Sequence, residues 1–130
     1  MRSEEAWIEM PDGVRLAATL YLPDQGDGPW PAVLEYLPYR KDDWTLRRDL
    51  TLYPYLADRG YVGARVDIRG TGRSQGRLPD GEYSERELEE WAGRIDGWRG
   101  DGVDVYAYFN NDWEGYAVRN GRSLRERLGV

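Results

Sequence analysis

The stretch YPYLADRGYVGARVDIRGTGRSQG, residues 53–76, decides the fold of this 130-residue chain. A short helix is expected at 54–59, because proline suits the first helical turn and Gly60 suits the position just past a helix end. A strand is expected at 61–68, where apolar side chains alternate with others: Val62, Ala64, Val66 and Ile68. Another short apolar run, Ala32–Leu37, precedes the helix. Strand, helix and strand at this spacing predict a parallel βαβ unit with a right-handed crossover.

The residues before this unit predict an antiparallel hairpin. Trp7–Met10 can form a short strand, Pro11-Asp12-Gly13 has the φ preferences of a turn, and Val14–Leu22 alternates apolar side chains with others. Residues 38–48 are polar and aromatic, which predicts a loop between the strand at 32–37 and the helix.

The C-terminal part predicts a helix, a strand and a second helix. Ser84 and Glu87 have the spacing of a capping box. The apolar face of a helix over 84–98 is expected to consist of Leu88, Trp91, Ile95 and Trp98. Val103–Phe109 has the pattern of a strand that could join the sheet in parallel, and residues 115–128 have that of an amphipathic helix. The fold class is therefore α/β.

The composition excludes several classes of function. The net charge is −6 with no basic tail or face, so neither a nucleic acid nor a membrane is expected as a partner. The chain has no signal-peptide pattern and no long apolar run, which predicts a cytoplasmic protein. It contains no cysteine and no histidine, which excludes a Ser-His-Asp triad built from its own residues and zinc sites with those ligands. We expect no metal and no cofactor.

Residues 72–76, GRSQG, match the G-x-S-x-G pattern of a serine-hydrolase nucleophile elbow. In such an elbow a strand runs directly into the serine and a helix leaves it. Here the expected strand ends near Ile68, and Pro79 prevents a long helix from starting soon after Gly76. Because no histidine can activate the hydroxyl, we interpret Ser74 as part of a turn that glycine permits. The glycines of this loop are also spaced one residue too widely for a dinucleotide-binding fingerprint.

Other polar residues are weaker candidates for a site. Asp42 and Asp43 are adjacent, so their side chains diverge, and a solvated loop is favoured over an acid–base pair. Asn110–Asp112 follows the expected strand and could bind a cation or a sugar, but turn formation and helix capping are the commoner uses of such a run. Lys41 is the only lysine, and its type allows a dyad with Ser74 that nothing else supports.

Residues 7–77 resemble the opening of one enzyme family. The stretches MPDGVRLAATLYLP at 10–23, WPAVLEYLPYRKDD at 30–43 and the quoted residues 53–76 are similar, in order and spacing, to the start of the cocaine-esterase/X-Pro dipeptidyl-peptidase group of α/β-hydrolases. The resemblance implies a partial α/β-hydrolase-like sheet and the chemistry of acyl-ester or X-Pro peptide hydrolysis. It also implies that the Tyr39 hydroxyl helps to line the oxyanion hole, and that the nucleophile, Asp and His follow the resembling region.

Residues 83–130 resemble a different family. The runs YFNND at 108–112 and AVRNGRSL at 117–124 are similar to the C-terminal end of the domain-of-unknown-function 72 family. That resemblance implies a TIM-barrel-like origin, with Asn110–Asp112 at the end of a barrel strand, where barrels place their chemistry.

Two segments are therefore expected, with a join near 78–84. Residues 1–82 form a truncated α/β-hydrolase-like segment, and residues 83–130 form a helix-strand-helix segment. Either the join is biological or the sequence combines two partial domains through an artefact. If it is biological, the helix over 84–98 could cover the sheet face that a hydrolase helix would cover.

Three functions are compatible with the sequence. The first is a hydrolase-like fragment that lacks the triad and has no catalysis of its own. The second is a binding or self-association module that pairs through exposed sheet edges, with the aromatic-rich loop 36–55 as its surface. The third is a weak hydrolase that uses Tyr39 as an oxyanion donor with an unconventional base.

Overall fold

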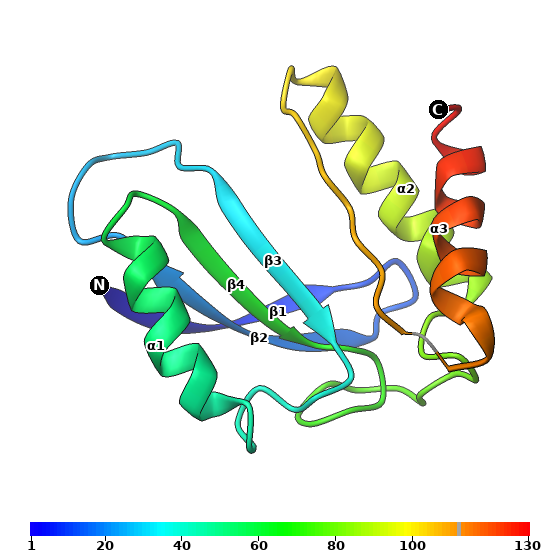
Figure 1. Ribbon diagram of the computed structural model, residues 1–130, viewed down its shortest axis with the longest axis horizontal. Helices are drawn as coiled ribbons and strands as arrows, with labels where there is room; N and C mark the ends of the chain where they lie inside the picture. Colours follow the sequence, from blue (N-terminus) through cyan, green and yellow to red (C-terminus); the bar gives the residue numbers. More distant parts are fainter. Residues whose placement is uncertain (112) are drawn as a thin grey trace. The chain divides into compact units, whose positions relative to one another are not determined.

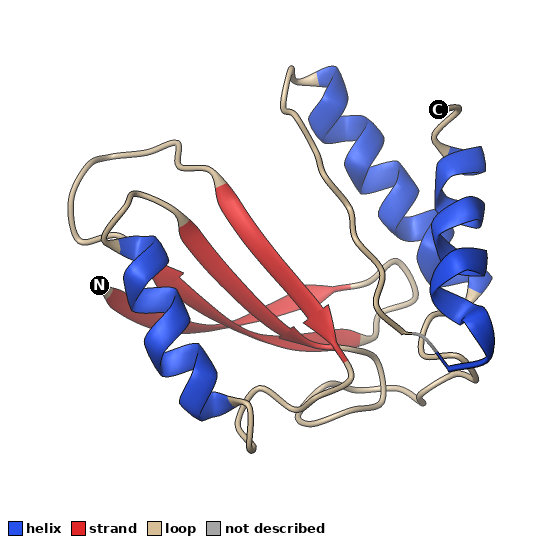
Figure 2. Cartoon of the chain, viewed as in Figure 1, coloured by secondary structure: helices blue, strands red, loops and turns tan. Residues whose placement is uncertain are grey.

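The computed structural model describes residues 1–111 and 113–130. Contacts divide the chain into two compact units, Met1–Leu78 and Pro79–Val130. Among the described residues, every strand belongs to the first unit, and the second unit contains helices joined by segments without regular secondary structure (Figures 1 and 2).

The first unit is built on a four-stranded mixed sheet with the order β1-β2-β4-β3. Its strands are β1 (Arg2–Glu9), β2 (Arg15–Leu22), β3 (Ala32–Leu37) and β4 (Val62–Asp67). β1 pairs antiparallel with β2, β2 pairs antiparallel with β4, and β3 pairs parallel with β4. The predicted hairpin and the predicted parallel βαβ unit are therefore confirmed. The strand expected at Trp7–Met10 is longer than the pattern indicates, because the polar residues from Arg2 onward also pair with β2.

The helix between β3 and β4 is the clearest correction in this unit. The sequence predicts it at 54–59 after a loop over 38–48, whereas α1 spans Leu46–Ala57. Its buried positions, Asp49, Tyr53 and Ala57, recur every four residues, but hydrophobic periodicity does not register a buried aspartate. Pro54 lies inside the helix rather than in its first turn. The hydrogen bond that Pro54 cannot donate would go to the carbonyl of Leu50, whose side of the helix is exposed to solvent.

The core of this unit lies on both faces of the sheet. One face carries a cluster of Met10, Leu16, Ala18 and Val66. On the other face, the Tyr53 ring of α1 stacks on Tyr21 of β2 with centroids 4.5 Å apart and rings 6° from parallel. The Tyr53 hydroxyl donates to Glu35 Oε2 at 2.8 Å. Gly63 lies beneath the Tyr53 ring, so close that a β-carbon there would be 2.1 Å from a ring carbon.

This tyrosine pair makes the first unit sensitive to alkali. Burial and the hydrogen bond to Glu35 raise the pKa of Tyr53, and burial together with the charge of Asp49 raises the pKa of Tyr21. Unfolded tyrosines ionise near about pH 10. A raised pKa in the folded state means that the stabilisation is complete below that pH and is lost as the pH rises above it. We expect the free energy of unfolding to fall steadily above about pH 10, with tyrosinate absorbance appearing together with loss of circular dichroism.

The matched variants for this prediction are Tyr53→Phe and Tyr106→Phe. Tyr53→Phe should reduce the fall in the free energy of unfolding at alkaline pH, because the phenylalanine ring can still stack but cannot ionise. Tyr106 is exposed, so Tyr106→Phe should leave the profile unchanged. An identical alkaline profile for wild type and Tyr53→Phe would contradict the prediction.

The second unit contains α2 (Glu85–Gly100), a 3-10 turn at Trp113–Gly115 and α3 (Tyr116–Arg127), so both predicted helices are confirmed. The predicted capping box is present, since the Ser84 side chain accepts from the Glu87 N–H and the Glu87 carboxylate accepts from the Ser84 N–H. A small core joins the two helices through Ala92, Ile95 and Leu124, with Val105, Phe109 and Leu128 packed against it. None of the helices in the described part of the chain is long and apolar enough to cross a membrane.

Two details of the second unit differ from expectation. Of the expected apolar face of α2, Leu88 and Ile95 are buried, whereas Trp91 is only partly buried and Trp98 is 40% exposed. Residues 103–109 are not a strand. The alternation in this segment serves packing on the helices, where Val105 and Phe109 join the small core. A strand also needs a hydrogen-bonded neighbour, and the sheet formed by the described residues contains only β1 to β4.

Candidate functional site

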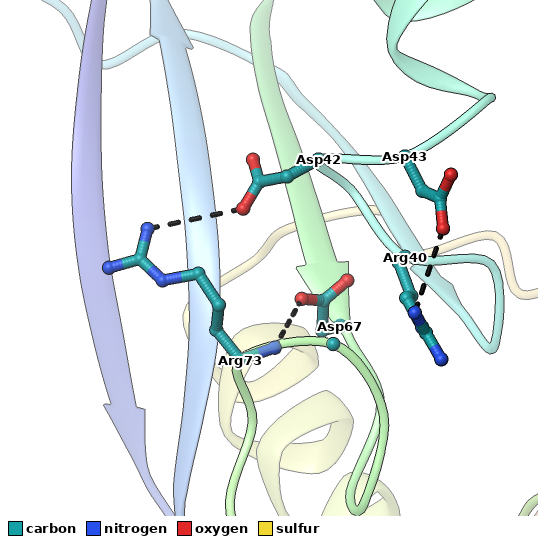
Figure 3. Close-up of a pocket in the computed structure, with 6 residues that line it drawn as sticks. Arg40, Asp42, Asp43, Asp67 and Arg73 are labelled. Atoms are coloured by element: carbon teal, nitrogen blue, oxygen red, sulfur yellow. Dashed lines mark hydrogen bonds and ion pairs between the residues drawn. The ribbon is translucent and has the colours of Figure 1, made fainter.

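The candidate site lies at the carboxyl ends of the parallel strands β3 and β4. The loop 38–45 leaves β3, and the glycine-rich loop 68–78 leaves β4. A pocket of about 240 Å³ lies between these loops (Figure 3). It is lined by Arg40, Asp42, Asp43, Asp67, Gly72 and Arg73. Ligands of open α/β sheets bind outside the carboxyl ends of the strands, so this is where the fold predicts a site.

Asp67, the last residue of β4, fixes both loops with one buried carboxylate. Its Oδ1 accepts from the Lys41 N–H at 2.7 Å, and its Oδ2 accepts from the Arg73 N–H at 3.1 Å. Gly72 has a φ of 52°, and a β-carbon there would be 2.1 Å from Asp67 Oδ2. Glycine is therefore needed at 72 both for the backbone conformation and for space.

Arg65 lies two residues earlier on β4, with a side chain that is 0% exposed. Its Nε donates to Asp49 Oδ2 at 3.1 Å, and its Nη1 donates to the Val66 carbonyl at 3.3 Å. Its Nη2 donates to the Tyr39 carbonyl and, at 3.3 Å, to Thr45 Oγ1. The guanidinium thus joins β4, α1 and the loop 38–45.

Lys41 attaches the same loop to β1. Its buried Nζ lies 2.9 Å from Glu5 Oε2 and 3.0 Å from Asp42 Oδ1. Glu5 also accepts from Arg73 Nη1 at 2.8 Å and from the Thr19 hydroxyl at 2.7 Å. Because Lys41 is engaged with two carboxylates, the structure gives no support to a Ser-Lys dyad.

This cluster predicts a modest loss of stability in acid. Burial alone would raise the pKa of Glu5, but hydrogen bonds from Thr19 and Lys41 and the charges of Lys41 and Arg73 outweigh it and lower the pKa. A lowered pKa in the folded state stabilises the fold above the unfolded value, about 4.3, and this contribution is lost as the pH falls below it. Denaturant titrations at falling pH should show Glu5→Gln losing less stability in acid than wild type.

Glu4→Gln is the control for this prediction. Glu4 is exposed and forms a surface pair with Arg2 at 3.3 Å, so its replacement should leave the acid profile unchanged. Equal acid dependence in wild type, Glu5→Gln and Glu4→Gln would contradict the role assigned to Glu5.

The Ser74 hydroxyl is fully used in holding the glycine-rich loop. It donates to the Asp67 carbonyl at 2.6 Å and accepts from the Ala17 N–H at 2.8 Å. The Ser74 N–H donates to the Thr71 carbonyl, as in a turn. β4 ends seven residues before the serine, and the next helix begins at Glu85. These contacts support the interpretation of Ser74 as a turn residue rather than a nucleophile.

Tyr39 lies in the loop that leaves β3, and its side chain is 48% exposed. Its ring makes an edge contact with Trp44, with centroids 5.7 Å apart. The neighbouring aspartates diverge, as expected from their adjacency. Asp42 lies 4.0 Å from Arg73 Nη1, and Asp43 lies 3.7 Å from Arg40 (Figure 3). The role of Tyr39 in an oxyanion hole stays a prediction at this point.

The run Asn110–Asp112 contributes to the second unit, except for Asp112, which lies outside the described residues. Asn111 Nδ2 donates to the Gly81 carbonyl at 3.0 Å, and the Asn111 carbonyl accepts from the Ala117 N–H at 2.9 Å. These bonds fit a turn at the start of α3. The described residues contain no group of three or more His, Cys, Asp or Glu side chains that could hold a metal ion.

The residues that organise the site, Arg65, Asp67 and Asp49, are not among the site residues that the sequence predicts. The alternation on β4 indicates one apolar and one exposed face, but both faces are covered. A signal is nevertheless present, because a strand in a βαβ unit is covered by its crossover helix on one face and therefore buries its intervening residues as well. Charged residues at those positions must then have buried partners.

Several solved structures similar to this chain are described as hydrolases, and another is described as an aminopeptidase. A CocE/NonD family hydrolase from Staphylococcus aureus is 26% identical with a TM-score of 0.56, over 73% of this chain and 20% of that chain. An α-amino acid ester hydrolase is 25% identical with a TM-score of 0.51, over 75% of this chain and 18% of its own. An aminopeptidase from a Thaumarchaeota archaeon of marine sediment shares the fold at 21% identity, with a TM-score of 0.57 over 78% of this chain and 19% of its own. The chain thus spans about a fifth of the length of these proteins.

No curated protein sequence matches this chain. Residues 12–96 match the X-Pro dipeptidyl-peptidase (S15) family, and they include both loops of the pocket. The match also extends past the join expected near 78–84 into α2. The resemblance of residues 83–130 to the domain-of-unknown-function 72 family stays a prediction. Since the match covers well over half of its residues, the chain belongs to the X-Pro dipeptidyl-peptidase S15 family of hydrolases.

Proposed function

We propose that this chain carries the oxyanion-binding side of an S15-type hydrolase site, with the Tyr39 hydroxyl as the donor. The observation that carries the proposal is the position of Tyr39, half exposed in the loop that leaves the parallel strand β3. In α/β-hydrolases the loop after the corresponding strand supplies a donor to the oxyanion hole. A donor must be free to face the oxygen on which negative charge develops.

The backbone of this loop supports a side-chain donor. The Lys41 N–H is already bound to the buried Asp67 carboxylate, and the Asp43 N–H donates to the Arg40 carbonyl at 3.2 Å. Both amides are therefore already hydrogen-bonded within the fold. The Tyr39 phenol can donate a hydrogen bond without breaking either of them.

We propose further that the 130 residues alone do not hydrolyse esters or X-Pro peptides. The chain has no histidine, and both hydrogen-bonding directions of the Ser74 hydroxyl are used. A serine without a base is a weak nucleophile. A chromogenic acyl ester and an X-Pro anilide should give no saturable turnover above buffer, and Ser74→Ala should change nothing. Saturable turnover abolished by Ser74→Ala would overturn this part of the proposal.

The oxyanion role is tested by grafting residues 12–96 in place of their counterpart in the S. aureus CocE/NonD hydrolase. In an active graft, Tyr39→Phe should lower kcat about 100-fold, since losing one oxyanion donor costs that much in other hydrolases. Tyr55→Phe is the control, because Tyr55 is exposed on α1. Unchanged kcat in Tyr39→Phe would reject the assignment of Tyr39.

A second candidate function is self-association through the outer edge of β3. Among the described residues β3 pairs only with β4, and its Leu34 side chain is 40% exposed. The other edge strand, β1, carries charges at Arg2, Glu4 and Glu5, which discourage edge pairing. The one charge of β3, Glu35, is engaged by Arg48 and Tyr53.

Light scattering during size-exclusion chromatography tests this candidate. It predicts a concentration-dependent dimer that Leu34→Lys abolishes and that Glu4→Lys, on the opposite edge, leaves intact. A strict monomer at high concentration would reject it.

A further inference from the structure

We propose that Arg65 is a positioning residue for Tyr39, holding the oxyanion-binding loop through its backbone rather than through the tyrosine side chain. The inference deepens the proposed function and rests on it for its catalytic meaning. It starts from the hydrogen bond that the buried Arg65 Nη2 donates to the Tyr39 carbonyl.

The bond is part of a chain that reaches both ends of the loop. Arg65 Nη2 also donates to Thr45 Oγ1 at 3.3 Å, and the Thr45 hydroxyl donates to the Arg40 carbonyl at 3.1 Å. Two successive loop carbonyls, those of Tyr39 and Arg40, are therefore fixed by groups anchored on β4 and at the start of α1. The Tyr39 ring itself has an edge contact with Trp44, which is largely exposed and belongs to the same loop. Its orientation consequently depends on the loop backbone.

The need to neutralise the charge of Asp49 does not explain why Arg65 is buried beside it. Arg48 already donates to Asp49 Oδ1 through Nε at 3.0 Å and through Nη2 at 2.7 Å. Burying a second guanidinium beside the same carboxylate carries a desolvation cost. What Arg65 adds is a planar group whose Nη2 reaches the loop while its Nε stays on Asp49, and a lysine ammonium cannot span both positions.

The test uses the full chain and nuclear magnetic resonance. In wild type, the Arg65 Nη protons should be individually resolved and slow to exchange, because they are hydrogen-bonded and buried. In Arg65→Lys, we expect the Arg40 amide nitrogen to shift, since it reports the bond accepted by the Tyr39 carbonyl. Hydrogen exchange at the Lys41 amide should become about tenfold faster, because the loop loses the stabilisation of roughly one hydrogen bond and opens more often.

Arg48→Met is the matched control, because it removes an arginine from Asp49 and Glu35 without touching Tyr39. It should leave the Arg40 and Lys41 signals in place. If both variants unfold, the wild-type protein still tests whether Arg65 is hydrogen-bonded to the loop. Arg65 Nη protons with averaged signals and rapid exchange would overturn the inference. A folded Arg65→Lys with unchanged loop signals would overturn it as well.

The catalytic consequence is measured in the same graft as Tyr39. There Arg65→Lys should lower kcat about tenfold while leaving KM unchanged, because the donor is misplaced by a lost hydrogen bond rather than removed. Changed loop signals together with an unaffected Tyr39→Phe kcat would reject the proposed function and keep the structural role of Arg65. A kcat lowered by Tyr39→Phe but not by Arg65→Lys would reject the positioning role and keep the proposed function.

Discussion

Replacing Gly63 with alanine should lower the free energy of unfolding of this chain by about 3 kcal/mol, the upper end of the usual cost of overpacking. The added β-carbon would lie 2.1 Å from one carbon of the Tyr53 ring and 2.7 Å from the next. The ring cannot retreat, because it is held between the stacked Tyr21 and the hydrogen bond to Glu35. Either β4 or α1 must move, and both belong to the βαβ unit.

Denaturant unfolding followed by far-ultraviolet circular dichroism measures this effect. Gly97→Ala is the control, since Gly97 lies on α2 with open space around its α-carbon. That change should stabilise its helix by about 1 kcal/mol, the difference in helix propensity between the two residues. A Gly63→Ala protein as stable as wild type would contradict the close packing of the Tyr53 ring on Gly63 of β4.

Replacing Asp49 with asparagine should lower the free energy of unfolding by about 3 kcal/mol, because it removes one partner of a buried ion pair. Asp49 and Arg65 are both 0% exposed, so the arginine would lose its closest carboxylate without gaining water. The next carboxylate, that of Glu35, is 3.8 Å from Arg65 Nε.

The double variant Asp49→Leu with Arg65→Met separates the pair from its individual members. It should be less destabilised than the two single changes combined, since apolar residues of similar volume often replace buried ion pairs at little cost. It should still be about 1 kcal/mol or more less stable than wild type, because the Tyr39 carbonyl and Thr45 Oγ1 lose the hydrogen bonds from Arg65. Asp43→Asn is the control, because the Asp43–Arg40 pair is exposed and should contribute less than about 1 kcal/mol. If the double variant were as unstable as the two single changes combined, the two residues would not act as a pair.

The sequence predicts those parts of the fold that depend on alternation and turn chemistry. The hairpin, the parallel βαβ unit and the Ser84 capping box follow from residue patterns that act locally. It does not predict α1 correctly, because the buried face of that helix includes Asp49, whose burial depends on Arg65, a partner sixteen positions away. The pattern at 103–109 correctly indicates side chains that pack in a core. It is wrong in predicting a strand, because a strand requires a neighbouring strand with which to form hydrogen bonds.

The candidate site is predictable only in part. The resemblance points to Tyr39, and the absence of histidine from the sequence argues by itself against Ser74 as a nucleophile. The buried charges that shape the loops escape sequence reasoning, because Arg65 and Asp67 occupy strand positions that a one-sided sheet would expose. Their role depends on coverage by α1, which is a tertiary property.

The glycine-rich loop after β4 also bears on where this protein accepts a tag or an inserted peptide. Its glycine content suggests that it would tolerate an insertion, but most of its backbone N–H groups are already hydrogen-bonded. The donors are the amides of Gly70, Thr71, Arg73, Ser74 and Gln75. Gln75 bonds to the Arg15 carbonyl, which ties the loop to β2. The loop at residues 24–28 consists of exposed residues, and no strand or helix depends on it for pairing. Tolerance of an insertion follows the hydrogen bonding of the backbone rather than its glycine content, so residues 24–28 are the place to splice in a reporter.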